Sequence, residues 1–92
     1  MANRTVELQL PADEAWNMLK AVAADLGNVE ESHETSRFLI FKARYGLNPV
    51  RLRVSVQSGA SDATSRLEIQ ARGQDIWGVA SRKTMDRLCA AF

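Results

Sequence analysis

Basic side chains recur at alternate positions in three stretches of this chain that have the pattern of β-strands. They are Lys42, Arg44, Arg51, Arg53 and Arg72. Because alternate residues of a strand face the same side of a sheet, we expect these cations to gather on one face. Arginine and lysine offer several hydrogen-bond donors to carboxylates and phosphates. Three interpretations follow: a solvated surface, a contact surface for a protein, or a site for a polyanion.

Two apolar side chains are expected next to this basic patch. Phe38 and Ile40 alternate in the same direction as Lys42 and Arg44, so they also face outward. Aromatic residues and arginines are common in protein interfaces, and an uncovered sheet face suits a two-fold dimer. We therefore predict protein contact or self-association through this face.

Binding of nucleic acid or another polyanion is an alternative function for the same face. Arginines would contact phosphates, and Phe38 would stack on a base. The formal net charge is only +1, however, and Glu7, Glu68 and Glu30 weaken the positive field. Nucleic acid is therefore the less favoured partner.

The pairing of the predicted strands brings like charges together. The Gly-Leu-Asn-Pro stretch after the third strand has the composition of a four-residue turn. With that turn, Arg44 lies opposite Arg51, and Lys42 lies opposite Arg53. Matching the apolar residues of the next strand pair places Arg53 opposite Glu68. Like charges directly across a strand pair are unfavourable, so the patch is a candidate for contact with an opposite charge.

The residue types needed for catalysis or metal binding are scarce. His33 is the single histidine and Cys89 the single cysteine, so a disulfide within the chain and a thiolate metal cluster are excluded. His33 and Glu31 lie in a polar stretch, which indicates a solvated strand and offers too few ligands for a zinc site. Cys89 lies on the apolar side of a predicted helix, which favours a small packed side chain. We expect no enzyme activity, no metal and no cofactor.

Two helices and five strands must position these residues. Helical spacing of apolar residues predicts one helix over 11–26 and another that begins at Asp75, or after Gly78, and continues to the end. Gly27 is expected to end the first helix in a left-handed conformation. Alternation predicts strands over 4–10, 28–34, 36–45, 50–57 and 63–72. The stretch 28–34 is polar and charged, which is typical of a sheet edge.

The apolar alternation lies on one face of the predicted sheet, and only the two amphipathic helices can cover it. We therefore expect a single α+β domain over residues 1–92, with the element order β-α-β-β-β-β-α. Its sheet should be five-stranded and antiparallel, with both helices packed on the same face. The other face is left to solvent or to a partner.

This element order resembles the half-domain of the TATA-box-binding protein. It is also similar to a shortened helix-grip fold of the START and birch-pollen-allergen type, through the residues Leu10-Pro11-Ala12-Asp13-Glu14-Ala15-Trp16. The second resemblance implies an alternative function, the binding of a small apolar ligand between helices and sheet. The pocket would be lined by Trp16, Trp77, Met85 and Phe92. Core packing of the same residues is the other interpretation.

The composition is ordinary for a globular domain, with 46% hydrophobic and 25% charged residues. The first five residues are polar and contain no apolar signal region. No apolar run approaches the roughly 20 residues that span a bilayer. With one cysteine in the chain, a reducing cytoplasm is the expected location.

Overall fold

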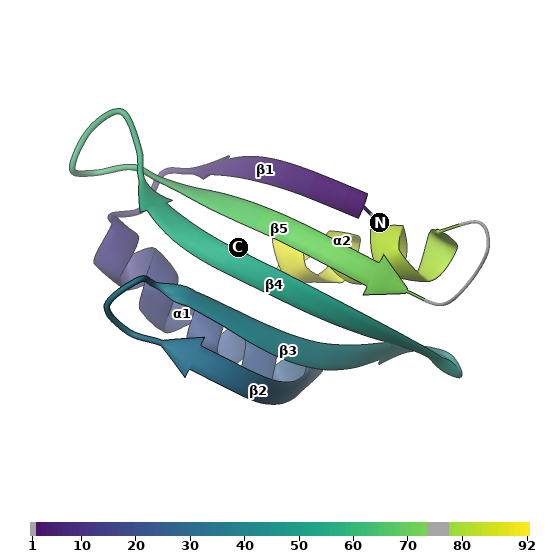
Figure 1. Cartoon of the computed structure of the whole chain (residues 1–92). Helices are drawn as coiled ribbons and strands as arrows, with labels where there is room; N and C mark the ends of the chain where they lie inside the picture. Colours follow the sequence, from purple (N-terminus) through teal and green to yellow (C-terminus); the bar gives the residue numbers. More distant parts are fainter. Residues whose placement is uncertain (1, 74–77) are drawn as a thin grey trace.

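A computed structural model of the chain describes residues 2–73 and 78–92. Figure 1 shows its elements in the predicted order: β1 (Ala2–Leu8), α1 (Ala12–Leu26), β2 (Gly27–His33), β3 (Phe38–Tyr45), β4 (Asn48–Ser58), β5 (Ser65–Gly73) and α2 (Val79–Ala90). The predicted elements are confirmed, and their ends differ from the predicted ones by a few residues. The first strand ends at Leu8, and Pro11 directly precedes the helix rather than lying within it.

All five strands pair antiparallel in one sheet, in the order β1-β5-β4-β3-β2. Strands β3, β4 and β5 form a meander at its centre, and β1 and β2 are its edges. Both helices lie on the same face of the sheet, behind it in the view of Figure 1. Because α1 connects β1 to β2, it links the two edges of the sheet. The predicted α+β architecture is confirmed.

Alternation in the central strands decides which sheet face the helices cover. Leu52, Val54 and Leu67 are completely buried, whereas Arg51 and Arg53 between them are exposed. Burial of one such aliphatic side chain contributes about 1.5–3 kcal/mol, so the inward face is strongly specified. The helices contribute several side chains to the same core, among them Trp16, Leu19, Met85 and Leu88.

Strand β1 carries a charge on its inward side. Val6 and Leu8 face the helices as predicted, and Arg4 lies on the same side. The Arg4 guanidinium is 2.8 Å from the Asp86 carboxylate of α2 and donates a hydrogen bond to the half-buried Cys89 sulfur at 3.7 Å. An inward charge on an edge strand opposes pairing with another chain. Arg4 therefore attaches α2 to the sheet and also protects this edge.

The prediction of a left-handed helix cap at Gly27 is wrong. Its φ of −170° is extended, and it is the first residue of β2. A Cβ atom here would overlap the Lys42 carbonyl oxygen of β3 and lie 2.8 Å from the carbonyl carbon. Glycine is needed because the two backbones approach closely where α1 passes directly into β2.

Strand β2 is an edge strand, as its polar sequence predicts. Its register on β3 shifts between the pairs Val29–Phe41 and Glu31–Ile40. The intervening residue, Glu30, forms a bulge that interrupts the regular alternation. Its charges and its bulge both discourage another chain from pairing with this edge.

The second helix begins at Val79, so the later of its two predicted starts is confirmed. Gly78 precedes it with a φ of 69°, a conformation that glycine adopts without a steric penalty. The alternative start at Asp75 lies outside the described residues. Thr84 is buried within this helix and donates its hydroxyl hydrogen to the Ala80 carbonyl at 2.7 Å, so its polar atom is satisfied.

Substitution of Gly27 tests the close approach of β2 to β3. Gly27→Ala should destabilise the fold by about 1–3 kcal/mol, because the added methyl group overlaps backbone that can yield only by moving the strand. Thermal unfolding followed by circular dichroism measures the change. Leu47→Ala is the control: this side chain is 94% exposed, and its truncation should alter stability by less than about 0.5 kcal/mol. Equal stability of the two variants would contradict the close approach.

Candidate interaction surface

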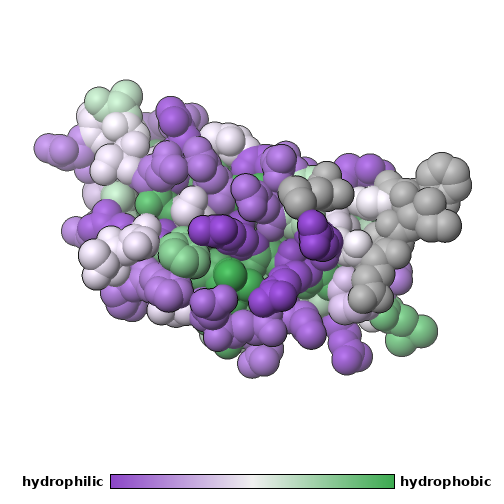
Figure 2. Space-filling model, in the orientation of Figure 1, coloured by the Kyte–Doolittle hydropathy of each residue, from purple (hydrophilic) through white to green (hydrophobic). Residues whose placement is uncertain are grey.

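In the described part of the chain, no helix or loop covers the sheet face opposite the helices, and the predicted cations lie on this face. We call this surface, formed by the outward residues of the five strands, the open face. All five side chains are exposed: Lys42, Arg44, Arg51, Arg53 and Arg72. Figure 2 shows hydrophilic side chains around a small apolar area near the middle of this face.

The pairing of β3 with β4 differs from the predicted one. A two-residue loop, Gly46-Leu47, joins these strands instead of a four-residue turn, and its glycine has a φ of 62°. Two-residue loops with glycine in the first position suit the twist of a hairpin. The register is therefore displaced by two residues, so Lys42 lies opposite Arg51, and Arg44 lies opposite Pro49.

The pairing of β4 with β5 is displaced in the same way. Arg53 lies opposite Gln70 and not opposite Glu68, and Arg51 lies opposite Arg72. Inward residues are still paired with inward residues of the neighbouring strand, because a displacement of two residues leaves each residue on the same side of the sheet. The alternation alone could not distinguish the two registers.

The observed registers align three cations across the sheet. Lys42, Arg51 and Arg72 lie directly opposite one another on β3, β4 and β5, and we call them the cation row. Like charges in this arrangement repel one another. Among the described residues, the carboxylate that pairs with the row is that of Glu30, whose oxygen is 3.1 Å from Arg51 Nε. The β2 bulge thus supplies one counter-charge. Glu30 was expected to weaken the positive field, but its pairing with Arg51 was not predicted, because the register of this strand could not be fixed from the sequence.

Phe38 and Ile40 lie on the open face as predicted, but both are half-buried by their neighbours. The His33 ring stacks on Phe38 with centroids 4.4 Å apart, and the Arg53 guanidinium carbon lies 4.7 Å from the Phe38 centroid. A cation–π contact at an exposed site is worth roughly 0.5–1 kcal/mol. Ile40 lies opposite Arg53 on the neighbouring strand. Both apolar side chains are therefore held in place by polar residues that remain open to solvent.

Two hollows lie on the open face, on either side of the Arg53–Gln70 pair. The basic hollow has a volume of about 220 Å³ and is lined by Ile40, Arg51, Arg53, Gln70, Ala71 and Arg72. The Glu68 hollow has a volume of about 280 Å³ and is lined by Ser36, Phe38, Arg53, Ser55, Glu68 and Gln70. Glu68, Gln70 and Ser55 were not among the predicted binding residues. The signal that could have indicated them was their outward position next to the cations.

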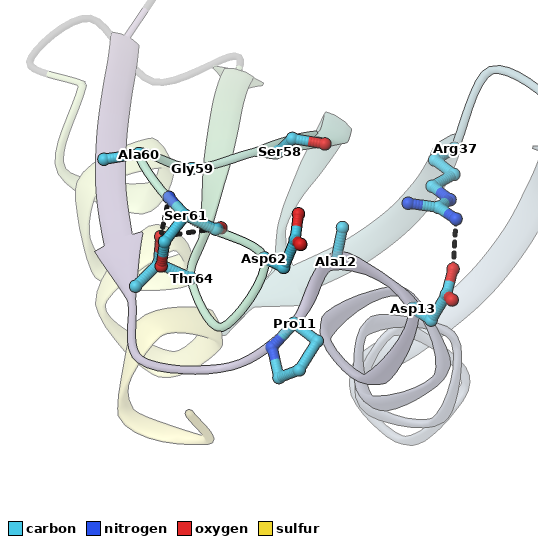
Figure 3. Close-up of a pocket in the computed structure, with 10 residues that line it drawn as sticks. All are labelled: Pro11, Ala12, Asp13, Arg37, Ser58, Gly59, Ala60, Ser61, Asp62 and Thr64. Carbon is cyan, nitrogen blue, oxygen red and sulfur yellow. Dashed lines mark hydrogen bonds and ion pairs between the residues drawn. The ribbon is translucent and has the colours of Figure 1, made fainter.

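A third hollow lies between the start of α1 and the β4–β5 loop, and Figure 3 shows it in close-up. It has a volume of about 320 Å³ and is lined by Pro11, Ala12, Asp13, Arg37, Ser58, Gly59, Ala60, Ser61, Asp62 and Thr64. Several of its polar groups bind one another. Asp13 forms an ion pair with Arg37, and the Thr64 hydroxyl accepts a hydrogen bond from the Ser61 N–H at 3.1 Å. These contacts hold the β2–β3 turn and the β4–β5 loop in place.

The residues predicted for an apolar-ligand pocket pack in the core. Trp16 and Met85 are buried, and Phe92 is half-buried against the same cluster. Trp77 lies outside the described residues. None of the three hollows is lined by these side chains. Their placement is that of core packing, and a ligand role for them stays a prediction.

Trp16 also makes a polar contact at the edge of the core. Its indole N–H donates to a Glu34 carboxylate oxygen at 2.6 Å, and Lys20 Nζ is 2.9 Å from the other oxygen. The hydrogen bond from Trp16, followed by that from Lys20, lowers the pKa of Glu34. The β2–β3 turn is thereby attached to α1 on the side opposite the open face.

The two residues with the greatest potential for catalysis, His33 and Cys89, do not line either hollow of the open face, although His33 stacks on Phe38, which does. His33 is exposed on β2, where its Nε2 is 3.4 Å from a Glu31 oxygen, and Cys89 is half-buried on α2. Residues 2–73 and 78–92 contain no group of three or more His, Cys, Asp or Glu side chains arranged to hold a metal ion. In the same residues, no helix has the length and apolar character needed to cross a membrane.

Comparisons with known proteins indicate the fold alone. No protein-family model and no curated protein sequence matches this chain. Among solved structures, the crystal structure of an uncharacterized protein from Bacillus thuringiensis is similar, with a TM-score of 0.65. The similarity covers 98% of this chain and 88% of that chain at 10% sequence identity. This β-α-β-β-β-β-α arrangement therefore also occurs in a protein of very different sequence.

The contact between Trp16 and Glu34 should be visible in a pH titration by NMR. The Trp16 indole N–H signal should move when Glu34 takes up a proton, with a midpoint below about 4.3, the value of an unperturbed glutamate. The contribution of this carboxylate to stability is fully present above its unfolded-state pKa. It is lost as pH falls through the lowered pKa of the folded state.

Glu34→Gln is the matched control for this titration. The amide keeps a hydrogen-bond acceptor near the indole but cannot titrate, so the movement of the Trp16 signal should disappear. A Trp16 signal that titrates equally in the parent protein and in this variant would contradict the assignment.

Proposed function

We propose that the chain is a non-enzymatic interaction module that binds another protein, or a second copy of itself, through the open face. The cation row carries this proposal, because Lys42, Arg51 and Arg72 are aligned next to Ile40 on a surface that no helix or loop of the described residues covers, with Phe38 further along the same strand. Like charges held this close lower stability unless opposite charges meet them. Carboxylates on a partner surface would supply the missing charge.

The apolar centre of the open face favours a protein over a small anion. Interfaces between proteins combine aromatic side chains and arginines at their centre with a polar rim. Phe38, held by His33 and Arg53, provides an aromatic group in a defined position. Such pre-ordered side chains reduce the entropy that is lost on binding.

Two further parts of the proposal, the absence of catalysis and the cellular location, rest on His33 and Cys89. Absence of catalysis is proposed because the contacts of His33 are with Glu31 and Phe38 and the polar contact of Cys89 is with Arg4, so these contacts in the described residues do not join a nucleophile to a general base. A cytoplasmic location is proposed because Cys89 is the single cysteine in the sequence. The resemblance to the TATA-box-binding protein half-domain and to the helix-grip fold concerns topology and assigns no partner.

Charge reversal on β4 tests the proposed surface. Arg51→Glu combined with Arg53→Glu should weaken self-association, or the capture of a partner protein, by about tenfold or more, because both side chains line the basic hollow. Solution mass from light scattering over a range of protein concentrations measures self-association. Affinity capture followed by quantification measures other partners.

The control for this variant has the same change in net charge on the helical side. Lys83→Glu combined with Arg87→Glu alters two exposed residues of α2 and should leave association unchanged. Association that survives reversal of Arg51 and Arg53, or that is lost equally in the control, would overturn the proposal.

A polyanion is the second candidate, because the cation row could contact successive phosphates. Three phosphate contacts with a single strand predict that affinity falls by roughly tenfold to twentyfold between about 50 and 200 mM salt. Fluorescence anisotropy of a labelled single-stranded oligonucleotide measures this dependence. No binding at low salt, or an affinity that is independent of salt, would exclude a polyanion.

A further inference from the structure

Charges on the open face are segregated along the strands. The cation row lies towards one end of the sheet. A central row follows, formed by Ile40, Arg53 and Gln70. A third row lies beyond it and is formed by Phe38, Ser55 and Glu68. The cation row and the third row are thus equally far from the central row, and they differ in charge.

This spacing makes the open face complementary to itself. A two-fold axis that runs along the central row, across the strands, would stack two open faces with their strands antiparallel. Residues of one strand that are equally distant from the axis then meet. Arg72 and Glu68 both lie on β5, two residues to either side of Gln70. Arg72 of each copy would therefore meet Glu68 of the other copy.

Both of these side chains are available for such a contact. Arg72 and Glu68 are exposed, and neither forms an ion pair with another residue in the described part of the chain. Two other arginines of the face already have carboxylate partners, since Arg66 pairs with Glu7 at 2.8 Å and Arg51 pairs with Glu30 at 3.1 Å. Arg53 belongs to the central row, but its guanidinium lies over Phe38, which moves its charge away from the axis.

The hollows and the size of the face fit the same arrangement. The two-fold axis places the basic hollow of one copy opposite the Glu68 hollow of the other. The facing hollows leave room for the long arginine side chains. Ile40 lies on the axis and provides an apolar contact at the centre. The extents of the chain are 39 × 21 × 19 Å, so the projected area of its broadest side is at most roughly 800 Å², the area that each partner contributes to a standard interface.

We propose that the open face is the contact surface of a homodimer in which Arg72 of each copy pairs with Glu68 of the other. This proposal rests on the proposed function and specifies its occupant. An acidic protein or a polyanion would need the cation row alone, and Glu68 would repel it. The dimer needs both Arg72 and Glu68, and this requirement separates it from the other occupants.

Complementation between charge-reversed variants tests this pairing. Arg72→Glu and Glu68→Arg should each raise the dimer dissociation constant by about tenfold or more, because two attractive contacts become repulsive. An equimolar mixture of the two variants should recover association to within about threefold of the parent chain, because both pairs are restored in the heterodimer. The double variant Arg72→Glu/Glu68→Arg should recover as a homodimer. Sedimentation velocity measures each mass.

The control and the contrary outcomes keep this test independent of folding. Lys83→Glu on α2 should associate like the parent chain, and circular dichroism verifies that each variant is folded. A parent chain that stays monomeric at every concentration, or a mixture that associates no better than its components, would overturn the homodimer. If an interaction with another protein is then still lost on reversal of Arg51 and Arg53, the proposed function stands with that protein as the occupant. If nothing depends on these arginines, both proposals fail.

Discussion

One-sided burial of the sheet is the constraint on which this structure depends. The inward positions of the central strands are mostly apolar, and most of their outward positions hold charged or polar side chains such as Arg51, Arg53 and Glu68. A helix packed on the outward face would remove these charges from water at a cost of several kcal/mol per ion, and it would leave half of the apolar face uncovered. Both helices must therefore share one face.

The connections follow from that requirement. Because α1 joins the two sheet edges on a single face, it passes into β2 without a loop, and Gly27 is the residue that permits this close approach. The turn after β2 is attached back to α1 through the Glu34 contact with Trp16 and the Arg37 ion pair with Asp13. A polar contact at the rim of the core thus positions a turn that the apolar pattern leaves undefined.

The face that folding does not use is where charge accumulates. Most outward positions hold polar or charged side chains, and three of these positions in one row are cations. Repulsion within the row is tolerated in water because solvent and salt screen exposed charges. The same repulsion gives a partner with opposite charge an advantage, which connects the packing of the core to the proposed role of the open face. The segregation of Arg72 from Glu68 then makes a second copy a suitable partner.

Local patterns were sufficient for the order of the elements, the inward or outward direction of the residues in the four strands other than β2, and the edge position of β2. These properties depend on periodicity within one segment, so they can be recognised without knowing what packs against it. It was predictable, for the same reason, that the candidate binding residues share one face of the sheet.

The residues that lie opposite them on the neighbouring strands were not predictable. A displacement of two residues leaves every apolar side chain on the same side, so burial cannot select between the registers, and the geometry of the Gly46-Leu47 loop made the choice. The partners of Arg51, Gly27 and Trp16 lie on other elements, and such contacts exist only once the chain has folded.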